Sequence, residues 1–390
     1  MQAQNLRVGP RHPRLGNAAY RLPPPPGGAP PARPRLPPHH SGVAPTNNSP
    51  PRRRPQRGEA VYVAGLACSG THNSGIALIE ITQKDGPRLI VNNEEERFSG
   101  EKHTTEYPRR SIDAMVAQLR AMGRDVGDIA AFVTTWDYPV LLATMARTLL
   151  EEAPGSLAML WQPETPAIDR RRLDQMRRTP RILARQLGLS EPAQLICMPH
   201  HDNHAWYSLA ASPFSDSAEP VAIAVIDGTG DQGSVTLYVA QNGAMRQLYC
   251  NDSVFDSLGC FYSVISSTQG GWTWLSCEGR YMGAAAWGDM NRASNRYYAR
   301  LREVLDLGPD GAIRLNRAMA NWYRDPFDKP YKQPLIDILG PPLRPDQLWN
   351  PDAVLRVEDI QHRPDTQDRL DKAASAQLVL ADARFHAVDQ

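Results

Sequence analysis

The sequence lacks a sizeable excess of either charge, because 43 basic and 42 acidic side chains leave a formal net charge of +1 over 390 residues. No overall field therefore favours nucleic acid or a membrane surface as a partner. No apolar stretch approaches the roughly 18–20 residues of a membrane-spanning helix. The five cysteines are scattered, odd in number and without a CxxC pair. We therefore expect neither a disulfide framework nor a cysteine zinc site, and we expect a reduced, cytoplasmic location.

Acidic residues are missing altogether from the first 58 positions, where proline and arginine are abundant. Such a segment cannot bury enough apolar surface to offset the entropy of ordering it, and its prolines prevent a regular helix. We interpret residues 1–58 as a disordered tail or as an over-extended translation start. A polybasic contact with nucleic acid or membrane is an alternative. A secretory signal is excluded because the segment has no apolar core.

From Ala60 onward the composition is that of an α/β domain, which we place at 59–390. Apolar runs predict buried strands, and shorter runs predict strands that pair back, at 61–66, 76–81, 88–92, 129–134, 221–226 and 234–239. Helices are expected at 107–122 and 138–152, with an arginine-rich amphipathic helical insertion at 165–190 whose charge faces solvent. Two blocks are each built as a strand, a glycine-containing polar turn and a strand. This repetition suggests a duplicated α/β architecture.

Three histidines occur within the five residues 200–204, in a chain that has only ten. If this segment is helical, His200 and His204 lie one turn apart on one face, where both imidazoles can reach a single cation. The alternative is a polar helix start without a ligand. No HExxH glutamate is present, so a zincin protease is excluded.

A second polar segment, 227–231 (DGTGD), follows the predicted strand 221–226 directly. Asp227 would project at the carboxyl end of that strand, where α/β proteins bind ligands, and Gly228 and Gly230 would let the backbone approach a phosphate or metal. An ordinary hairpin turn explains the segment almost as well. Together with the two histidines, however, Asp227 makes a plausible iron or zinc site.

His72 lies in the polar turn predicted at 69–75, where Gly70 and Gly75 leave room around its ring. A neutral imidazole near pH 7 is suited to removing a proton from a substrate hydroxyl. A lone loop histidine is more often an inert surface group, so the sequence by itself leaves both interpretations open.

The segment 92–98 is a charge run, and Lys102 and His103 follow it. Such runs usually form a solvated face. This one could also supply carboxylates and cations that orient a polar acceptor.

Five blocks, in this order, resemble the antibiotic and nodulation carbamoyltransferase family, whose members carbamoylate aminoglycosides, cephalosporins, novobiocin precursors and nodulation factors. The blocks are Gly65-Leu66 with the His72 turn, EEERF at 94–98 with Lys102-His103, the histidines of 200–205, Asp227-Gly228, and EGRYMGAAAWG at 278–288. The similarity covers about residues 61–290 and extends more weakly to 380. One block would mean little, but five in order are specific.

The resemblance implies a duplicated actin-like (ribonuclease H-like) domain related to the tRNA threonylcarbamoyl-transferase protein. In that family a smaller second domain makes carbamoyl-AMP from carbamoyl phosphate and ATP. The actin-like domain moves the carbamoyl group to a hydroxyl of a small molecule or sugar-containing acceptor. Carried onto the matching residues, the resemblance makes His72 the base at the acceptor. It makes the turn glycines a cofactor contact and predicts three ligands for Fe(II) or another divalent metal: His200, His204 and Asp227.

The sequence departs from the family pattern at several points. Asn73 stands where the family has aspartate, Arg280 replaces a lysine, and the opening turn is longer. The family's AGGVALN, GDDG and GPRALG segments do not occur, so the resemblance predicts a domain that is incomplete at its C-terminal end. A truncated gene, a fragment or a split enzyme with a separately encoded C-terminal domain would each look like this.

Two rival interpretations belong to other functional classes. One is a non-catalytic actin-like module that binds ligands or regulates without turnover. The other is an actin-fold kinase, which we disfavour because the usual pair of phosphate loops is incomplete.

Overall fold

The computed structural model describes residues 60–68, 73–154, 156–157, 170–253, 255–270, 277–321, 329–343 and 364–389. The chain divides into two compact units, Met1–Pro51 and Arg52–Gln390, and all described residues belong to the second. The predicted tail at 1–58 and the turn residues 69–72, which include His72, lie outside the described residues.

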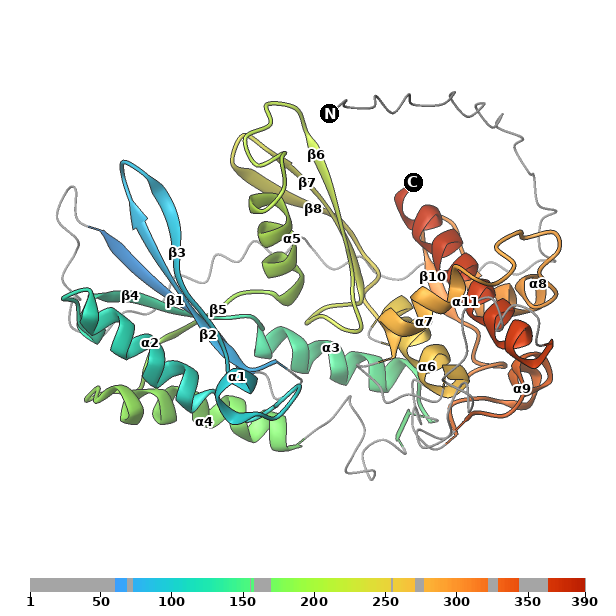
Figure 1. Cartoon of the computed structure of the whole chain (residues 1–390), viewed down its shortest axis with the longest axis horizontal. Coiled ribbons are helices and arrows are strands. Elements are labelled where there is room, and N and C mark those ends of the chain that lie inside the picture. Colours follow the sequence, from blue (N-terminus) through green and yellow to red (C-terminus); the bar gives the residue numbers. More distant parts are fainter. Residues whose placement is uncertain are drawn as a thin grey trace, which may run out of the picture. The chain divides into compact units, whose positions relative to one another are not determined.

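The first sheet has five strands in the order β3-β2-β1-β4-β5 (Figure 1). The strands β1, β2 and β3 form an antiparallel meander, and β4 and β5 extend β1 in parallel. The four strands predicted in this block, β1 to β4, are confirmed with ends that differ by at most two residues, whereas β5 was not predicted. Their bounds are β1 Val61–Ala67, β2 Gly75–Thr82, β3 Gly86–Glu94, β4 Ile129–Thr134 and β5 Leu195–Cys197.

Two helices, α2 (Arg109–Ala121) and α4 (Arg170–Leu187), supply apolar side chains to the core of this sheet. The helical spacing of Ile112, Met115 and Leu119 buries all three, as the sequence predicts. The amphipathic helix predicted within 165–190 is confirmed as α4, and its apolar face reaches the same core, where Leu183 is fully buried. The short helix α1 (Glu96–Ser99), the turn η1 (Val126–Asp128) and the helix α3 (Tyr138–Glu151) complete the block.

The charge run at 92–98 is only partly the solvated face that its composition suggests, since Asn92 and Arg97 are exposed and two glutamates are buried. Glu95 and Glu96 are only 5% and 9% exposed. The carboxylate of Glu95 accepts the backbone N–H groups of Arg110 at 3.1 Å and Ser111 at 2.8 Å, in the first turn of α2. Unpaired N–H groups at a helix start require acceptors and favour negative charge, so this glutamate has a structural reason to be buried.

The second sheet is an antiparallel meander of β6 (Val221–Ile226), β7 (Val235–Gln241) and β8 (Ala244–Cys250). The helix α5 (His200–Ala210) packs Ala205 against this sheet. The strand, turn and strand predicted in each block are thus confirmed, and each pair continues into a third antiparallel strand, β3 or β8. Among the described residues the second sheet has no parallel continuation, so an actin-like duplication is not confirmed.

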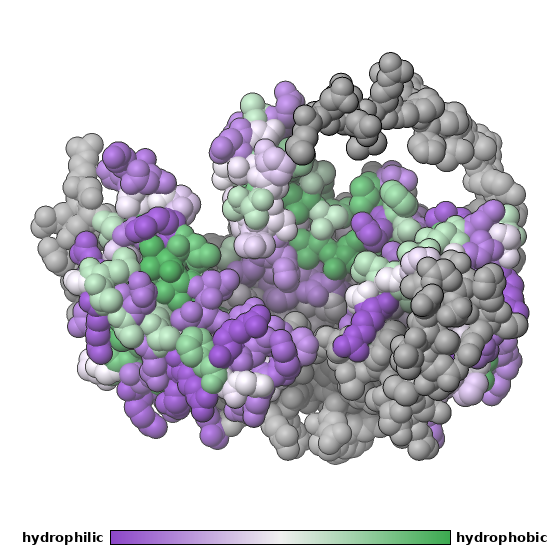
Figure 2. Space-filling model, viewed as in Figure 1, coloured by the Kyte–Doolittle hydropathy of each residue, from purple (hydrophilic) through white to green (hydrophobic). Residues whose placement is uncertain are grey.

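The strand β6 is an edge strand in the described part of the chain, although its apolar sequence predicts burial on both sides. Its residues Ala222 and Ala224 are exposed, whereas Val225 is buried. In the view of Figure 2, hydrophobic surface lies beside α5, where Figure 1 shows the strands β6 to β8.

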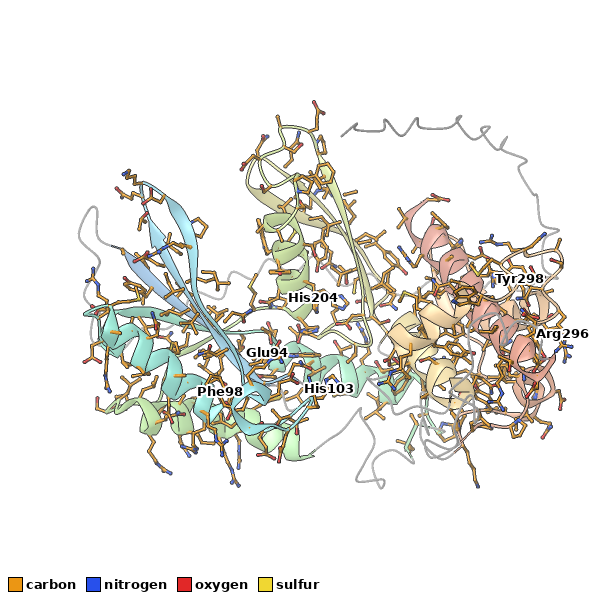
Figure 3. All side chains as sticks on the ribbon, viewed as in Figure 1. Glu94, Phe98, His103, His204, Arg296 and Tyr298 are labelled. Carbon is orange, nitrogen blue, oxygen red and sulfur yellow. The ribbon has the colours of Figure 1, made fainter. Side chains whose placement is uncertain are left out.

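A second hydrophobic core lies under the last helix, α11 (Pro364–Val388), which packs against α6 and α7. Two aspartates of α11 accept from tyrosine hydroxyls and arginines of the segment 292–298: Asp382 from Arg292 and Tyr298, and Asp368 from Arg296 and Tyr297 (Figure 3).

None of the helices in the described residues has the length and apolar character that a membrane span requires. The other elements are α6 Leu258–Gly270, α7 Glu278–Ala285, α8 Tyr298–Leu301, η4 Arg302–Val304, β9 Leu305–Leu307, β10 Ile313–Leu315 and α9 Gln333–Leu339.

Candidate metal centre

The two predicted histidine ligands and the predicted aspartate come together at one point. The helix α5 begins at His200, which places His204 one turn later on the same face, as the sequence predicts. Asp227 follows the last residue of β6, so it projects from the carboxyl end of that strand. The side chains of His200, His204 and Asp227 are 17%, 51% and 33% exposed, so the cluster opens toward solvent on the His204 side.

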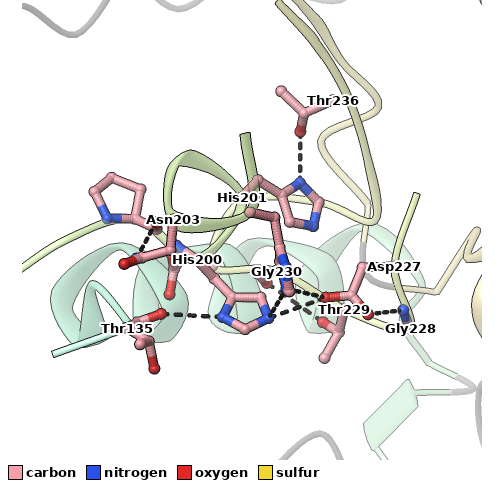
Figure 4. A network of polar contacts seen from close by, with 12 residues as sticks. Thr135, His200, His201, Asn203, Asp227, Gly228, Thr229, Gly230 and Thr236 are labelled. Carbon is pink, nitrogen blue, oxygen red and sulfur yellow. Dashed lines mark hydrogen bonds and ion pairs between the residues drawn. The ribbon is translucent and has the colours of Figure 1, made fainter. Parts of the chain in front are cut away.

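The three side chains are close enough to share one ion (Figure 4). The Nε2 of His200 lies 3.0 Å from Oδ2 of Asp227 and 3.2 Å from Nε2 of His204. The third distance, from Nε2 of His204 to Oδ2 of Asp227, is 3.5 Å. Atoms that bind one metal ion at about 2.0–2.2 Å lie roughly 3 Å apart, so the cluster fits a single ion. Two imidazoles and a carboxylate suit iron, zinc or manganese.

The imidazole of His200 is oriented from both sides. Its Nδ1 lies 3.0 Å from the carbonyl oxygen of Thr135, to which it can donate, leaving Nε2 to face the cluster. The indole of Trp136 stacks on the ring at 4.0 Å between centroids, with 17° between the planes. Metal-binding histidines characteristically donate the other ring N–H to a carbonyl or carboxylate, and this contact selects the tautomer that can bind an ion.

The carboxylate of Asp227 is held by its own turn. Its Oδ1 accepts the backbone N–H of Gly228 at 2.6 Å, which turns Oδ2 toward the histidines. The start of α6 presses on the backbone of the same residue, since a Cβ at Gly259 would lie 2.6 Å from the Asp227 carbonyl oxygen. The Ser257 hydroxyl donates to that oxygen at 3.0 Å. The ligand position is therefore fixed by neighbouring backbone.

The two turn glycines predicted to contact a cofactor have different surroundings. A Cβ at Gly230 would lie 2.5 Å from Nε2 of His201, so packing alone requires glycine there. A Cβ at Gly228 would meet no described atom within 4 Å, which leaves space for a ligand beside the backbone. A cofactor contact at either glycine stays a prediction.

The electrostatics of the cluster favour a cation. Burial raises the pKa of Asp227, but hydrogen bonds with His200 and His204 outweigh that effect and hold the pKa well below its usual range. The hydrogen bond with Asp227 raises the pKa of His204. Burial lowers the pKa of His201 to about 4, so this neighbouring ring is neutral near pH 7. Protons that the two imidazoles hold toward the anionic carboxylate can be exchanged for a metal ion.

Sequence reasoning missed two residues that hold the cluster in place. Asp231 is 3% exposed and accepts the backbone N–H groups of His200 and, at 3.0 Å, of Asp137. Burial raises the pKa of Asp231 to about 6. The aspartate was visible only as the last residue of a polar turn. The second residue is Trp136, which lies two positions after the end of β4. Nothing in the sequence connects it with a histidine more than sixty positions later.

The predicted base, His72, lies outside the described residues, but its neighbour Asn73 does not. Asn73 and His103 both have a positive φ, of 52° and 55°, which is uncommon for residues other than glycine. Their side chains meet, with Nδ1 of His103 3.2 Å from Oδ1 of Asn73. Asn73, at the described end of the opening turn, and the Lys102-His103 block therefore lie side by side, while His204 lies on α5 (Figure 3).

Comparison with known proteins supports the similarity suggested by the motifs. The family model described as "Carbamoyltransferase N-terminus" matches residues 63–327, more than half of the 390 residues. The nodulation protein NolNO of Sinorhizobium fredii is 26% identical over 329 residues, which cover 82% of this chain and 40% of that protein. The uncharacterized protein sll1178 of Synechocystis is 25% identical over 312 residues, 79% of this chain and 45% of its own length. The chain thus spans less than half of either relative.

Proposed function

We propose that this chain, which belongs to the carbamoyltransferase N-terminus family, transfers a carbamoyl group to a hydroxyl of a small molecule or sugar-containing natural product. Membership of this family supports a transferase. The observation that carries the proposal is the cluster of His200, His204 and Asp227, in which Nδ1 of His200 faces a carbonyl oxygen, a contact that favours the tautomer able to bind a cation through Nε2. Its half-exposed side offers access to a substrate.

We propose Fe(II) or another divalent metal as the ion of this cluster. The donor set fits, because the three facing atoms lie 3.0 to 3.5 Å apart and the second nitrogen of His200 faces a carbonyl oxygen. A bound divalent ion supplies Lewis-acid polarisation of an oxygen such as the carbamoyl carbonyl. The three protein ligands leave room for substrate, as catalytic metal sites do.

The donor in this proposal is carbamoyl-AMP. The acceptor oxygen attacks the carbamoyl carbon, the bond from that carbon to the phosphate oxygen breaks, and AMP leaves with the electron pair. The proton of the acceptor hydroxyl passes to a base, for which we propose His72. The neighbouring pair of Asn73 and His103 fixes the backbone on one side of that residue.

Carbamoyl-AMP itself would come from ATP and carbamoyl phosphate in a second domain, which we propose is a separately encoded partner. One observation supports a partner: the apolar strand β6 has an open edge in the described part of the chain, with Ala222 and Ala224 exposed. Unprotected apolar edge strands are ready sites for pairing with another chain.

The experiment supplies synthetic carbamoyl-AMP, which makes the second domain unnecessary. The purified chain is loaded with Fe(II) without oxygen and given a panel of sugar and small-molecule alcohols, and release of AMP is followed. Release that depends on an acceptor, and that disappears in His204→Ala, is the expected result. Tyr207→Ala, an exposed change on the same helix, is the control. Metal binding without acceptor-dependent release would favour the non-catalytic binding module instead.

A further inference from the structure

One short segment, 135–137, holds the start of α5 by two direct contacts and by a third through Asp231. The Thr135 carbonyl faces Nδ1 of His200 at 3.0 Å, and Trp136 stacks on the His200 ring at 4.0 Å. The backbone N–H of Asp137 donates to Asp231, which also accepts the backbone N–H of His200. The ring of His200 is therefore held directly by Thr135 and Trp136, and its backbone N–H shares the Asp231 carboxylate with Asp137.

The position of this segment is in turn set by the helix that it begins. Along α3, Arg147 donates to the carbonyl oxygen of Asp252 at 2.6 Å. At the helix end, Arg317 pairs with Glu152 at 2.6 Å and with Asp256 at 2.8 Å. The helix α3 is thus tied near its start, middle and end to residues that follow β6. Movement of the indole away from His200 would require several buried or half-buried contacts to break.

Trp136 also has a simpler explanation, as a core residue. It is 5% exposed and packs in a small hydrophobic cluster with Leu141 and Met176. That role requires apolar volume at position 136. The stack on His200 requires something more specific, a flat ring parallel to the imidazole. The two explanations therefore make different demands on a replacement side chain.

We infer that Trp136 is a positioning residue for the candidate metal site, acting through His200. This inference rests on the metal site of the proposed function. The carbonyl of Thr135 selects the tautomer of the ring, and the indole fixes the plane in which Nε2 points. Without the stack the imidazole can rotate about its bond to Cβ, and an ion then loses the fixed geometry of one ligand. Loss of such a supporting contact typically weakens metal binding by about 10–100-fold.

The test uses the full chain and two replacements at one position. Trp136→Leu keeps apolar volume and loses the ring, and Trp136→Phe keeps a flat ring. Fe(II) affinity is measured without oxygen by competition with a chelator, and the visible spectrum of Co(II) reports ligand geometry. We expect about 10-fold weaker binding and an altered Co(II) spectrum in Trp136→Leu, and near-parent behaviour in Trp136→Phe.

The matched control is Phe132→Leu, an aromatic-to-leucine change on β4, the strand that precedes Trp136. Phe132 is 1% exposed and packs in the core of the first sheet rather than on His200. The control should lower the melting temperature and leave metal affinity unchanged. Equal affinity in the parent and Trp136→Leu would overturn the positioning role and leave the metal site standing. A parent chain that binds no metal would overturn both. Should Trp136→Leu fail to fold, Trp136→Phe and Trp136→Tyr decide, because weakened binding in both of these ring-bearing variants would contradict the inference.

Discussion

The backbone N–H of Asp137 donates to Oδ1 of Asp231 at 3.0 Å. Asp137 immediately precedes α3 and Asp231 lies in the turn that follows β6, so this bond joins the start of α3 to that turn. The other oxygen of the same carboxylate accepts the N–H of His200. One buried side chain therefore caps the starts of α3 and α5 together. A negative charge is favourable at both places, because each helix start presents unpaired N–H groups and the positive end of its dipole.

Replacing Asp231 by alanine should destabilise the chain. Two backbone N–H groups lose their acceptor, and each buried unpaired donor costs about 1–3 kcal/mol. We expect the free energy of unfolding, measured by urea titration, to fall by at least about 1–3 kcal/mol, the cost of one unpaired donor. Asp216→Ala, an exposed change between α5 and β6, is the control and should have little effect. A parent-like unfolding curve in Asp231→Ala would show that water replaces the carboxylate without cost.

The two glycines of the DGTGD turn should respond differently to alanine. Gly230→Ala places a methyl 2.5 Å from Nε2 of His201, and we expect it to lower stability by about 1–3 kcal/mol. Combining it with His201→Ala should recover part of that loss, although the Gly233 carbonyl oxygen, 2.9 Å from the same Cβ position, stays in place. Gly228→Ala should leave thermal stability close to that of the parent.

If the backbone at Gly228 approaches a ligand, its alanine variant should weaken carbamoyl-AMP binding without a matching loss of stability. Unchanged ligand affinity in Gly228→Ala would remove that residue from the site.

Ala224→Lys should reduce self-association of the isolated chain. The strand β6 contains no charged residue, and its free edge in the described part of the chain lacks the charges that protect natural edge strands. A lysine there discourages pairing with a second strand. Sedimentation velocity at several concentrations measures the change, and Ala218→Lys, an exposed loop substitution with the same added charge, is the control. Equal self-association of the parent and Ala224→Lys would contradict the prediction that the free edge of β6 pairs with a second strand.

His72→Ala should lower acceptor-dependent AMP release from carbamoyl-AMP by about two orders of magnitude, the usual size of general-base assistance. Asn73 cannot stabilise an imidazolium as a carboxylate would, so Asn73→Asp should raise the pKa of His72. His386→Ala is the control: this histidine lies on α11, where its ring contacts the carbonyl oxygen of Gly308, and it belongs to none of the proposed site residues. A rate in His72→Ala within about threefold of the parent would exclude this residue as the base.

The sequence allowed the strands and the histidine pair to be predicted because their signals are local. Uninterrupted apolar runs marked β1, β4 and β6, and the spacing of His200 and His204 is one helical turn. The contact of those histidines with Asp227 followed from the position of the aspartate after a strand. Each of these inferences needs only a short window of sequence.

The errors and omissions all concern contacts between distant segments. Glu95 reads as solvated until its position at the start of α2 is known. The sequence predicts the helix that contains Leu183 but not the core that this residue joins. The burial of β6 was overestimated because an apolar run does not reveal whether a strand has neighbours on both edges. The roles of Trp136 and Asp231 depend on packing between blocks, for which the sequence carries no periodic signal.

The most direct test of the central claim is the metal content of the parent chain and of His204→Ala. Half of the His204 side chain is exposed, so its removal should leave the fold intact. After loading with Fe(II) without oxygen and gel filtration, the parent should retain about one ion per chain, and the variant should lose most of it. Tyr207→Ala on the same helix should retain the parent value. Equal metal content in the parent and His204→Ala would show that the histidine cluster is structural and would contradict a metal centre at this site.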